Sequence, residues 1–192
     1  MKYVLILLLI ISTVACNKIT FEYGKVTQIE FQPENSPLEF KYDLLYYVPN
    51  KLKGKKNLKT LIFLHGGGNS TRTRSGSLNV TNLYMNDLKT IADELGIIVV
   101  TPSGSGLNWS AHLLNMLRQL NLEIRKNPEV DPNGIALSGH SMGGMGITRS
   151  AQWLADEYAF FMPTAAGMDP KYAVTKYLKT YFNFKYLSLI HI

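Results

Sequence analysis

The sequence has a single cysteine, Cys16, so no disulfide bond can form within the chain. Its four histidines do not fall at the short spacings that metal sites use, and we expect neither a metal nor a cofactor. Charged residues make up only 18% of the chain, and no nucleic-acid-binding motif accompanies the net charge of +6. We therefore expect no nucleic-acid partner. The chemistry left to this chain is that of its own side chains and backbone.

Long hydrophobic runs are also absent from the N-terminus. The apolar run Val4–Ile11 is too short to span a bilayer, which takes about 20 residues. Lys2 precedes this run and the small residues 12–15 follow it, a pattern typical of an export signal. We expect residues 1–15 to be a signal peptide and residues 16–24 a short tether.

Cys16 gives the signal two possible outcomes. The segment before it resembles the lipobox of bacterial lipoproteins, in which the cysteine is acylated after cleavage, although Thr13 stands where that pattern prefers leucine. A lone exposed thiol would otherwise be a liability in an oxidising compartment, so we favour a lipid anchor and membrane attachment at Cys16. The alternative is ordinary secretion with cleavage after Ala15. Both outcomes predict an exported bacterial protein.

Basic residues are concentrated between Lys51 and Lys59. We expect this segment to be a solvated loop between strands. Attraction to anionic lipid headgroups is the alternative.

Short apolar strands alternate with helical patterns in the rest of the chain. Because the inner strands are apolar throughout, we expect a mostly parallel sheet with helices on both faces, preceded by an antiparallel hairpin. The expected strands are 25–31, 38–48, 60–64, 97–101, 134–138, 159–166 and 181–189, and the expected helices are 83–95, 109–126 and 143–158. Gly96 and Pro102 are expected to end a helix and a strand. The loops 69–82 and 102–108 should then line a cleft at the carboxyl ends of the strands.

The pentapeptide Gly139–Gly143 has the form G-x-S-x-G and lies between an expected strand and an expected helix. In that setting it is typical of a nucleophile elbow, a sharp turn that exposes the serine, here Ser141. The simpler interpretation is a glycine-rich turn.

A second motif favours the elbow. His65–Gly68 forms an H-G-G-G loop directly after the expected strand 60–64, where such folds place an oxyanion-hole donor. The second donor should be the N–H of Met142, next to the nucleophile.

These residues carry a resemblance to the polyhydroxybutyrate-depolymerase and feruloyl-esterase-like branch of the α/β-hydrolases, often labelled carboxylesterase or prolyl-oligopeptidase-like. The matching segments are 64–68, 92–102, 130–144 and 165–170. The resemblance implies an α/β-hydrolase fold for residues 25–192 and cleavage of small or polymeric acyl esters. It implies Ser141 as the nucleophile and Gly67 and Met142 as the oxyanion-hole donors.

None of the four histidines fits the position of a general base. His65 belongs to the oxyanion loop, His112 begins a helix, the side chain of His140 should point away from Ser141, and His191 is the penultimate residue. The resemblance implies an acid and then a histidine after the serine, each beyond a further strand.

The acid is equally hard to assign. Asp169 is a candidate, but the resemblance implies a substrate-side or structural role for an Asp-Pro at this position. Asp156 and Glu157 lie at a helix end and should be solvated.

We therefore hypothesise that the chain is a C-terminal truncation that lacks the last strands, the triad acid and the histidine, and is by itself inactive. The final residues Leu187–Ile192 can be encoded by a transposon-end sequence used in sequencing libraries, which suggests read-through into an adapter rather than gene sequence.

A non-catalytic module that binds without cleaving, or a peptidase, is the alternative to a serine esterase.

Overall fold

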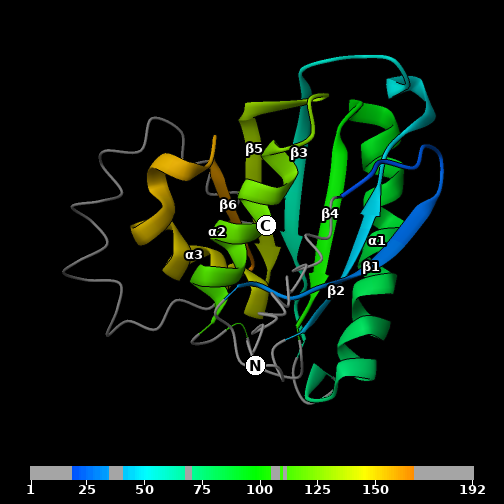
Figure 1. The fold of residues 1–192 in the computed structure, drawn as a ribbon. Helices are drawn as coiled ribbons and strands as arrows, with labels where there is room; N and C mark the ends of the chain where they lie inside the picture. Colours follow the sequence, from blue (N-terminus) through cyan, green and yellow to red (C-terminus); the bar gives the residue numbers. More distant parts are fainter. Residues whose placement is uncertain (1–18, 35–40, 68–70, 105–108, 110–111, 167–192) are drawn as a thin grey trace, which may run out of the picture.

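The computed structural model describes residues 19–34, 41–67, 71–104, 109 and 112–166 (Figure 1). They form one six-stranded sheet with the order β1-β2-β4-β3-β5-β6. The strands are β1 (Val26–Phe31), β2 (Tyr42–Tyr47), β3 (Leu58–Leu64), β4 (Ile98–Ser103), β5 (Val130–His140) and β6 (Phe161–Thr164). The pairs β1–β2 and β2–β4 are antiparallel, and β4, β3, β5 and β6 are parallel to one another. The mostly parallel sheet and the N-terminal hairpin are confirmed, while the strand expected at 181–189 lies outside the described residues.

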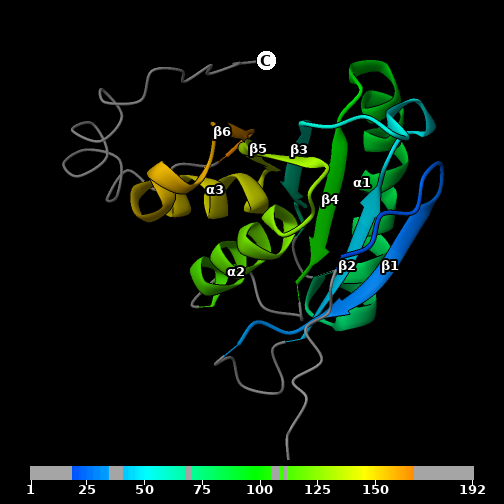
Figure 2. The ribbon, with the colours of Figure 1, turned by 45° about the horizontal axis from the view of Figure 1, so that its top comes forward.

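Helices cover both faces of this sheet, as predicted (Figures 1 and 2). The helices are α1 (Arg74–Leu95), α2 (Leu113–Arg125) and α3 (Met142–Leu154), with short 3₁₀ turns η1 (Asn50–Leu52) and η3 (Ala155–Glu157). Helix α1 packs on β2 and β4, whereas α2 and α3 pack on the opposite face over β5 and β6. Side chains of β3 alternate between the two cores: Leu61 and Phe63 face α1, while Ile62 and Leu64 face α2 and α3. Burial on both faces explains why the four residues Leu61–Leu64 of β3 are all apolar.

The parallel strands bring the two sequence motifs to one edge of the sheet. Leu64 of β3 pairs with Gly139 of β5, and His140 pairs with Thr164 of β6. The H-G-G-G segment and the G-x-S-x-G segment therefore leave adjacent strands at the same level, as the sequence predicted.

Helix α1 begins earlier than the sequence suggested, so the loop expected over 69–82 is wrong from Arg74 onward. The side chain of Thr73 caps the helix by accepting a hydrogen bond from the N–H of Gly76. The first turns bury Ser77 and Thr81, whose hydroxyls are hydrogen-bonded to His65 and to the Ser77 carbonyl. A buried face made of small polar residues has no hydrophobic periodicity, which is why the pattern missed it. Gly96 ends α1 as predicted, with a left-handed φ of 69°.

Other boundaries also differ. Strand β4 continues through Pro102, which was expected to end it. Pro102 pairs with Leu44 of the antiparallel strand β2. Alternate residue pairs in such a ladder exchange no backbone hydrogen bonds, so a residue without an N–H can be accommodated. Helix α2 begins at Leu113 rather than at residue 109. Helix α3 ends at Leu154 rather than at 158, because Tyr158 is extended and buries its ring, with its hydroxyl bonded to the Leu117 carbonyl.

The lysine-rich segment is exposed, as expected, but it is not all loop. Lys51 lies in η1 and donates to the Glu94 carbonyl, and Lys59 lies in β3 and pairs with Asp131. Within the described ranges, no helix is both long enough and apolar enough to cross a membrane.

Candidate active site

Ser141 occupies a strained turn between β5 and α3. Its φ of 52° and ψ of −113° place a non-glycine residue in a region that costs about 1–3 kcal/mol. Two hydrogen bonds hold it there: its N–H donates to the Thr164 carbonyl (2.9 Å), and its carbonyl accepts from the Met145 N–H (3.0 Å). Ser141 is half-buried rather than enclosed. This is the geometry that a nucleophile elbow requires.

The glycines of the elbow allow other backbone segments to pass close by. A Cβ on Gly143 would overlap the Leu64 carbonyl, and a Cβ on Gly139 would lie 2.7 Å from the Gly143 carbonyl carbon. A Cβ on Gly144 would lie 2.8 Å from the Thr164 carbonyl oxygen. The small residues around Ser141 are thus needed for close packing between α3 and the strand ends, as the sequence suggested.

Met142 is the first residue of α3. Its N–H therefore has no acceptor within the helix and lies at the positive end of the helix dipole. A developing negative charge close to Ser141 would be stabilised at such a position.

The glycine loop after β3 lies against the elbow. A Cβ on Gly66 would lie 2.9 Å from the His140 carbonyl oxygen, so the backbones of the two motifs are in direct contact. The next residue, Gly67, is exposed and has a φ of 149°, and a Cβ there would overlap the side chain of Thr71. The loop thus brings backbone against His140, the residue before Ser141. Gly68 lies outside the described residues.

His65 is a buried anchor for this loop. Its Nε2 lies 2.9 Å from Ser77 Oγ and 3.4 Å from the Gly104 N–H, and its Nδ1 lies 2.9 Å from the Gly66 carbonyl oxygen. These partners fit one neutral tautomer, in which Nδ1 donates to the carbonyl and Nε2 accepts from both donors. Burial lowers the pKa of His65, which favours this neutral form. These hydrogen bonds are those expected of a structural residue, the role that the sequence predicted for His65.

Trp109 completes the anchor. Its indole N–H donates to the His65 carbonyl (2.9 Å), and the two rings lie 4.9 Å apart. Ser77 of α1 and Trp109, in the segment before α2, thus hold the start of the glycine loop from two sides. Sequence reasoning missed both residues, because neither belongs to a motif.

Helix α1 reaches His140 as well. The Tyr84 hydroxyl lies 2.7 Å from His140 Nδ1, and the two rings are 5.9 Å apart. The imidazole next to the nucleophile is thus directed to α1, in keeping with the prediction that it points away from Ser141. Tyr84 gave no signal in the sequence.

The base and the acid are not assembled within the described residues. Neither His65 nor His140 makes a hydrogen bond to Ser141 there, and His112 is the N-cap residue of α2. Asp169 and His191 lie outside the described residues.

The other two carboxylates do not supply the acid. Asp156 is exposed, as expected, whereas Glu157 is half-buried and binds Arg118 at 2.8 Å.

A carboxylate that the sequence did not single out lies elsewhere on the same edge of the sheet. Asp43, at the start of β2, is 6% exposed and receives two hydrogen bonds from the guanidinium of Arg74, at 2.7 and 2.8 Å. Arg74 also reaches Glu30 at 3.1 Å. The guanidinium holds the pKa of Asp43 below its usual range. Bound in this way, and separated from β5 by β4 and β3, Asp43 ties α1 to the hairpin and is not placed to orient a base.

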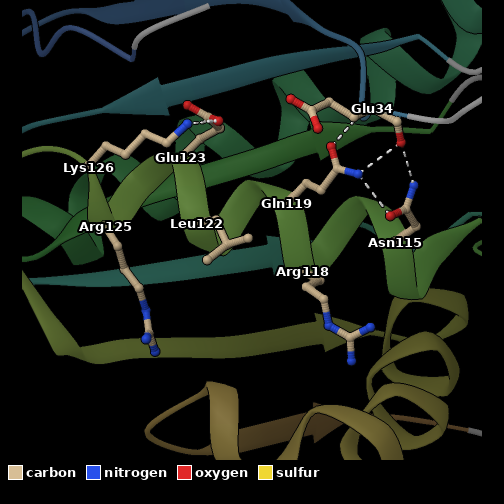
Figure 3. A pocket seen from close by; sticks show the side chains of 8 residues that line it. All are labelled: Glu34, Asn115, Arg118, Gln119, Leu122, Glu123, Arg125 and Lys126. Carbon is tan, nitrogen blue, oxygen red and sulfur yellow. Dashed lines mark hydrogen bonds and ion pairs between the residues drawn. The ribbon is translucent and has the colours of Figure 1, made fainter. Parts of the chain in front are cut away.

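A surface groove lies on α2 (Figure 3). Part of its polar lining is paired, since Gln119 bonds to Asn115 and to the backbone of Glu34. We find no group of three metal-ligating side chains among the described residues.

The sheet order, the helices on both faces and the elbow define an α/β-hydrolase fold, and comparison with solved structures agrees. A thermostable esterase matches with a TM-score of 0.59 and 16% identity over 75% of this chain and 41% of its own. A ferulic acid esterase matches with a TM-score of 0.56 and 20% identity over 74% of this chain and 58% of its own. LpqC, a poly(3-hydroxybutyrate) depolymerase from Bordetella parapertussis, matches with a TM-score of 0.57 and 14% identity over 72% of this chain and 51% of its own.

The chain thus has the α/β-hydrolase fold and spans about half the length of the solved structures that it matches. No family model and no curated protein sequence matches it.

Proposed function

We propose that the protein is a secreted or lipid-anchored serine hydrolase that cleaves carboxylic esters, with Ser141 as nucleophile. The observation that carries this proposal is the strained Ser141 turn in backbone contact with the glycine loop after β3. Strain of this kind persists where the surrounding structure enforces it, and it is common at catalytic residues. The matched esterases and the depolymerase support the ester as substrate class.

The proposed reaction has two halves, acylation of Ser141 and release of the acyl group by water. Ser141 Oγ attacks the ester carbonyl carbon while a base takes the hydroxyl proton, and the carbonyl oxygen becomes an oxyanion. The N–H groups of Gly67 and Met142 receive that oxyanion, and each donor is worth about 10²–10³ in rate. Collapse of the tetrahedral intermediate expels the alcohol, which takes the proton from the base. Water then attacks the acyl-enzyme by the same route and releases the acid.

We place the triad acid and histidine outside the described residues. The engagement of His65 and His140 with other partners supports this, as does the partial coverage of the matched structures.

A binding module that keeps the elbow without turnover is the second candidate. One observation favours this candidate: the described residues supply no base that is hydrogen-bonded to Ser141. The two candidates differ in whether a complete protein turns substrate over.

The test compares the full-length protein with its Ser141→Ala variant on short-chain aryl esters and on feruloyl esters. We expect turnover that falls by at least about 10³-fold in the variant, because removing one triad member leaves only oxyanion-hole and binding effects. Equal turnover rates in both proteins would refute Ser141 as the nucleophile, whereas binding of ester with no release of acid would establish the binding module.

A further inference from the structure

Tyr84 contacts both segments that build the proposed site. Its hydroxyl lies 2.7 Å from Nδ1 of His140, the residue that precedes the nucleophile. Its ring packs on Phe63, with centroids 5.3 Å apart, two residues before the start of the glycine loop. One side chain of α1 therefore connects the carboxyl ends of β3 and β5.

Gly66 is enclosed between these groups. A Cβ at Gly66 would lie 2.9 Å from the His140 carbonyl oxygen, 3.0 Å from His140 Nδ1 and 3.0 Å from the Tyr84 hydroxyl. The loop backbone thus lies against the hydrogen-bonded pair itself. If the pair separates, the imidazole can turn toward Gly66, and the loop loses the surface that fixes its distance from the elbow.

We propose that Tyr84 is a positioning residue, whose hydrogen bond to His140 fixes the spacing between Ser141 and the oxyanion loop. This inference rests on the proposed function, because it assigns Tyr84 an effect on the reaction at Ser141. Tyr84 touches no reacting atom and acts through His140 and Gly66. Its contribution belongs to the alignment of the oxyanion hole, which operates on the transition state rather than on ground-state binding.

The hydroxyl can be separated from the ring. Tyr84→Phe keeps the packing on Phe63 and removes only the hydrogen bond. Tyr47→Phe is the matched control: the Tyr47 hydroxyl also bonds to an α1 residue, Asp93, at 2.7 Å, but on β2, away from the elbow. A loss of general stability would affect both variants, whereas a loss of alignment would affect only the first.

In the full-length protein, we expect Tyr84→Phe to lower kcat about tenfold with KM changed less than about twofold. The expected loss is smaller than the 10²–10³-fold for deleting a donor, because both donors remain and only their alignment changes. Tyr47→Phe should keep the wild-type kcat. His140→Ala should lower kcat at least as much, and Tyr84→Phe should have no further effect in that background, since the two residues act as one unit. His140→Asn, which retains a polar atom near the Nδ1 position, should recover part of the loss.

A second readout does not depend on turnover. Amide hydrogen exchange should become faster in both 64–67 and 139–144 in Tyr84→Phe and stay unchanged there in Tyr47→Phe. An unchanged kcat, a change confined to KM, or unchanged exchange in both segments would overturn the inference. If Ser141→Ala turns over ester as fast as the wild type, the proposed function fails, and Tyr84 then has no role in catalysis. A wild type that depends on Ser141 but is indifferent to Tyr84→Phe refutes the positioning role alone.

Discussion

The N–H of Ser141 donates a hydrogen bond to the carbonyl oxygen of Thr164, with 2.9 Å between the two atoms. Thr164 is the last residue of β6, and its own hydroxyl returns a hydrogen bond to the Gly139 carbonyl at 3.0 Å. The strained serine is thus held by a neighbouring strand on one side and by the first turn of α3 on the other. Strain at a single residue is small compared with the packing of the elements that impose it, which is why the turn can persist.

The close approach of α3 to the end of β3 predicts a large cost for Gly143→Ala. The new methyl group would overlap the Leu64 carbonyl, which is backbone and cannot rotate away. We expect the free energy of unfolding to fall by about 3 kcal/mol, the upper end of the usual cost of overpacking. Urea denaturation at neutral pH measures this change.

Gly146→Ala is the control for that experiment. It adds the same methyl group in the same helix, but the closest atom is the end of the Leu113 side chain, at 3.1 Å, which can move. Both substitutions replace a helical glycine of α3 with alanine, so the difference mainly reports the contact with the Leu64 carbonyl. Equal stabilities of the two variants would mean that α3 does not lie against β3 as described.

The elements that the sequence predicted best are those with local signals. The apolar strands around 60–64 and 134–138 and the glycines of the elbow follow from hydrophobic pattern and motif, and these local features place Ser141. The anchors of the site could not be predicted in the same way. Each anchor contacts a partner between 12 and 56 positions away in the sequence: Ser77 and Trp109 contact His65, and Tyr84 contacts His140. A single side chain gives no sequence pattern from which such a distant partner could be predicted.

The buried neutral His65 predicts a loss of stability in mild acid. Burial lowers its pKa in the folded protein below the usual 6.5. The unfolded chain therefore binds a proton more readily, and the contribution of His65 is fully present above pH 6.5 and is lost as the pH falls below that value. Between pH 6.5 and 5, the free energy of unfolding should decrease with a slope of at most about 1.4 kcal/mol per pH unit from this one group.

His65→Gln checks the assignment. The variant should be less stable at pH 7.5 by about 1–3 kcal/mol, because Ser77 and the Gly104 N–H lose a buried partner. Its stability should vary less between pH 7.5 and 5 than that of the wild type. Parallel pH profiles for the two proteins would show that His65 is not the group responsible.

The export signal expected at residues 1–15 predicts where the protein should be found if it is bacterial. If Cys16 is acylated, the wild type should partition with the membrane fraction and incorporate labelled fatty acid. Cys16→Ser should abolish the label and release the protein into the soluble exported fraction. A wild-type protein that is exported without label would support ordinary secretion after Ala15.

The Arg74–Asp43 pair predicts a difference between two arginines. Asp43 is nearly buried and takes both of its charge-assisted hydrogen bonds from the guanidinium of Arg74, so Arg74→Ala leaves a desolvated carboxylate without its cation. Because Arg74 itself is partly exposed, water can replace some of the interaction, and we expect a loss of about 1–3 kcal/mol in the free energy of unfolding. Arg118→Ala, which removes a more exposed pair with Glu157, should cost at most about 1 kcal/mol. Arg74→Lys keeps the charge but not the paired geometry, so its loss of unfolding free energy should lie between those of the two alanine variants.

The lowered pKa of Asp43 means that its contribution is present at neutral pH and is lost as the pH falls below the usual aspartate value of 3.8. Urea denaturation of the three variants at pH 7 measures these differences, and equal losses for Arg74→Ala and Arg118→Ala would contradict the structural role assigned to Asp43.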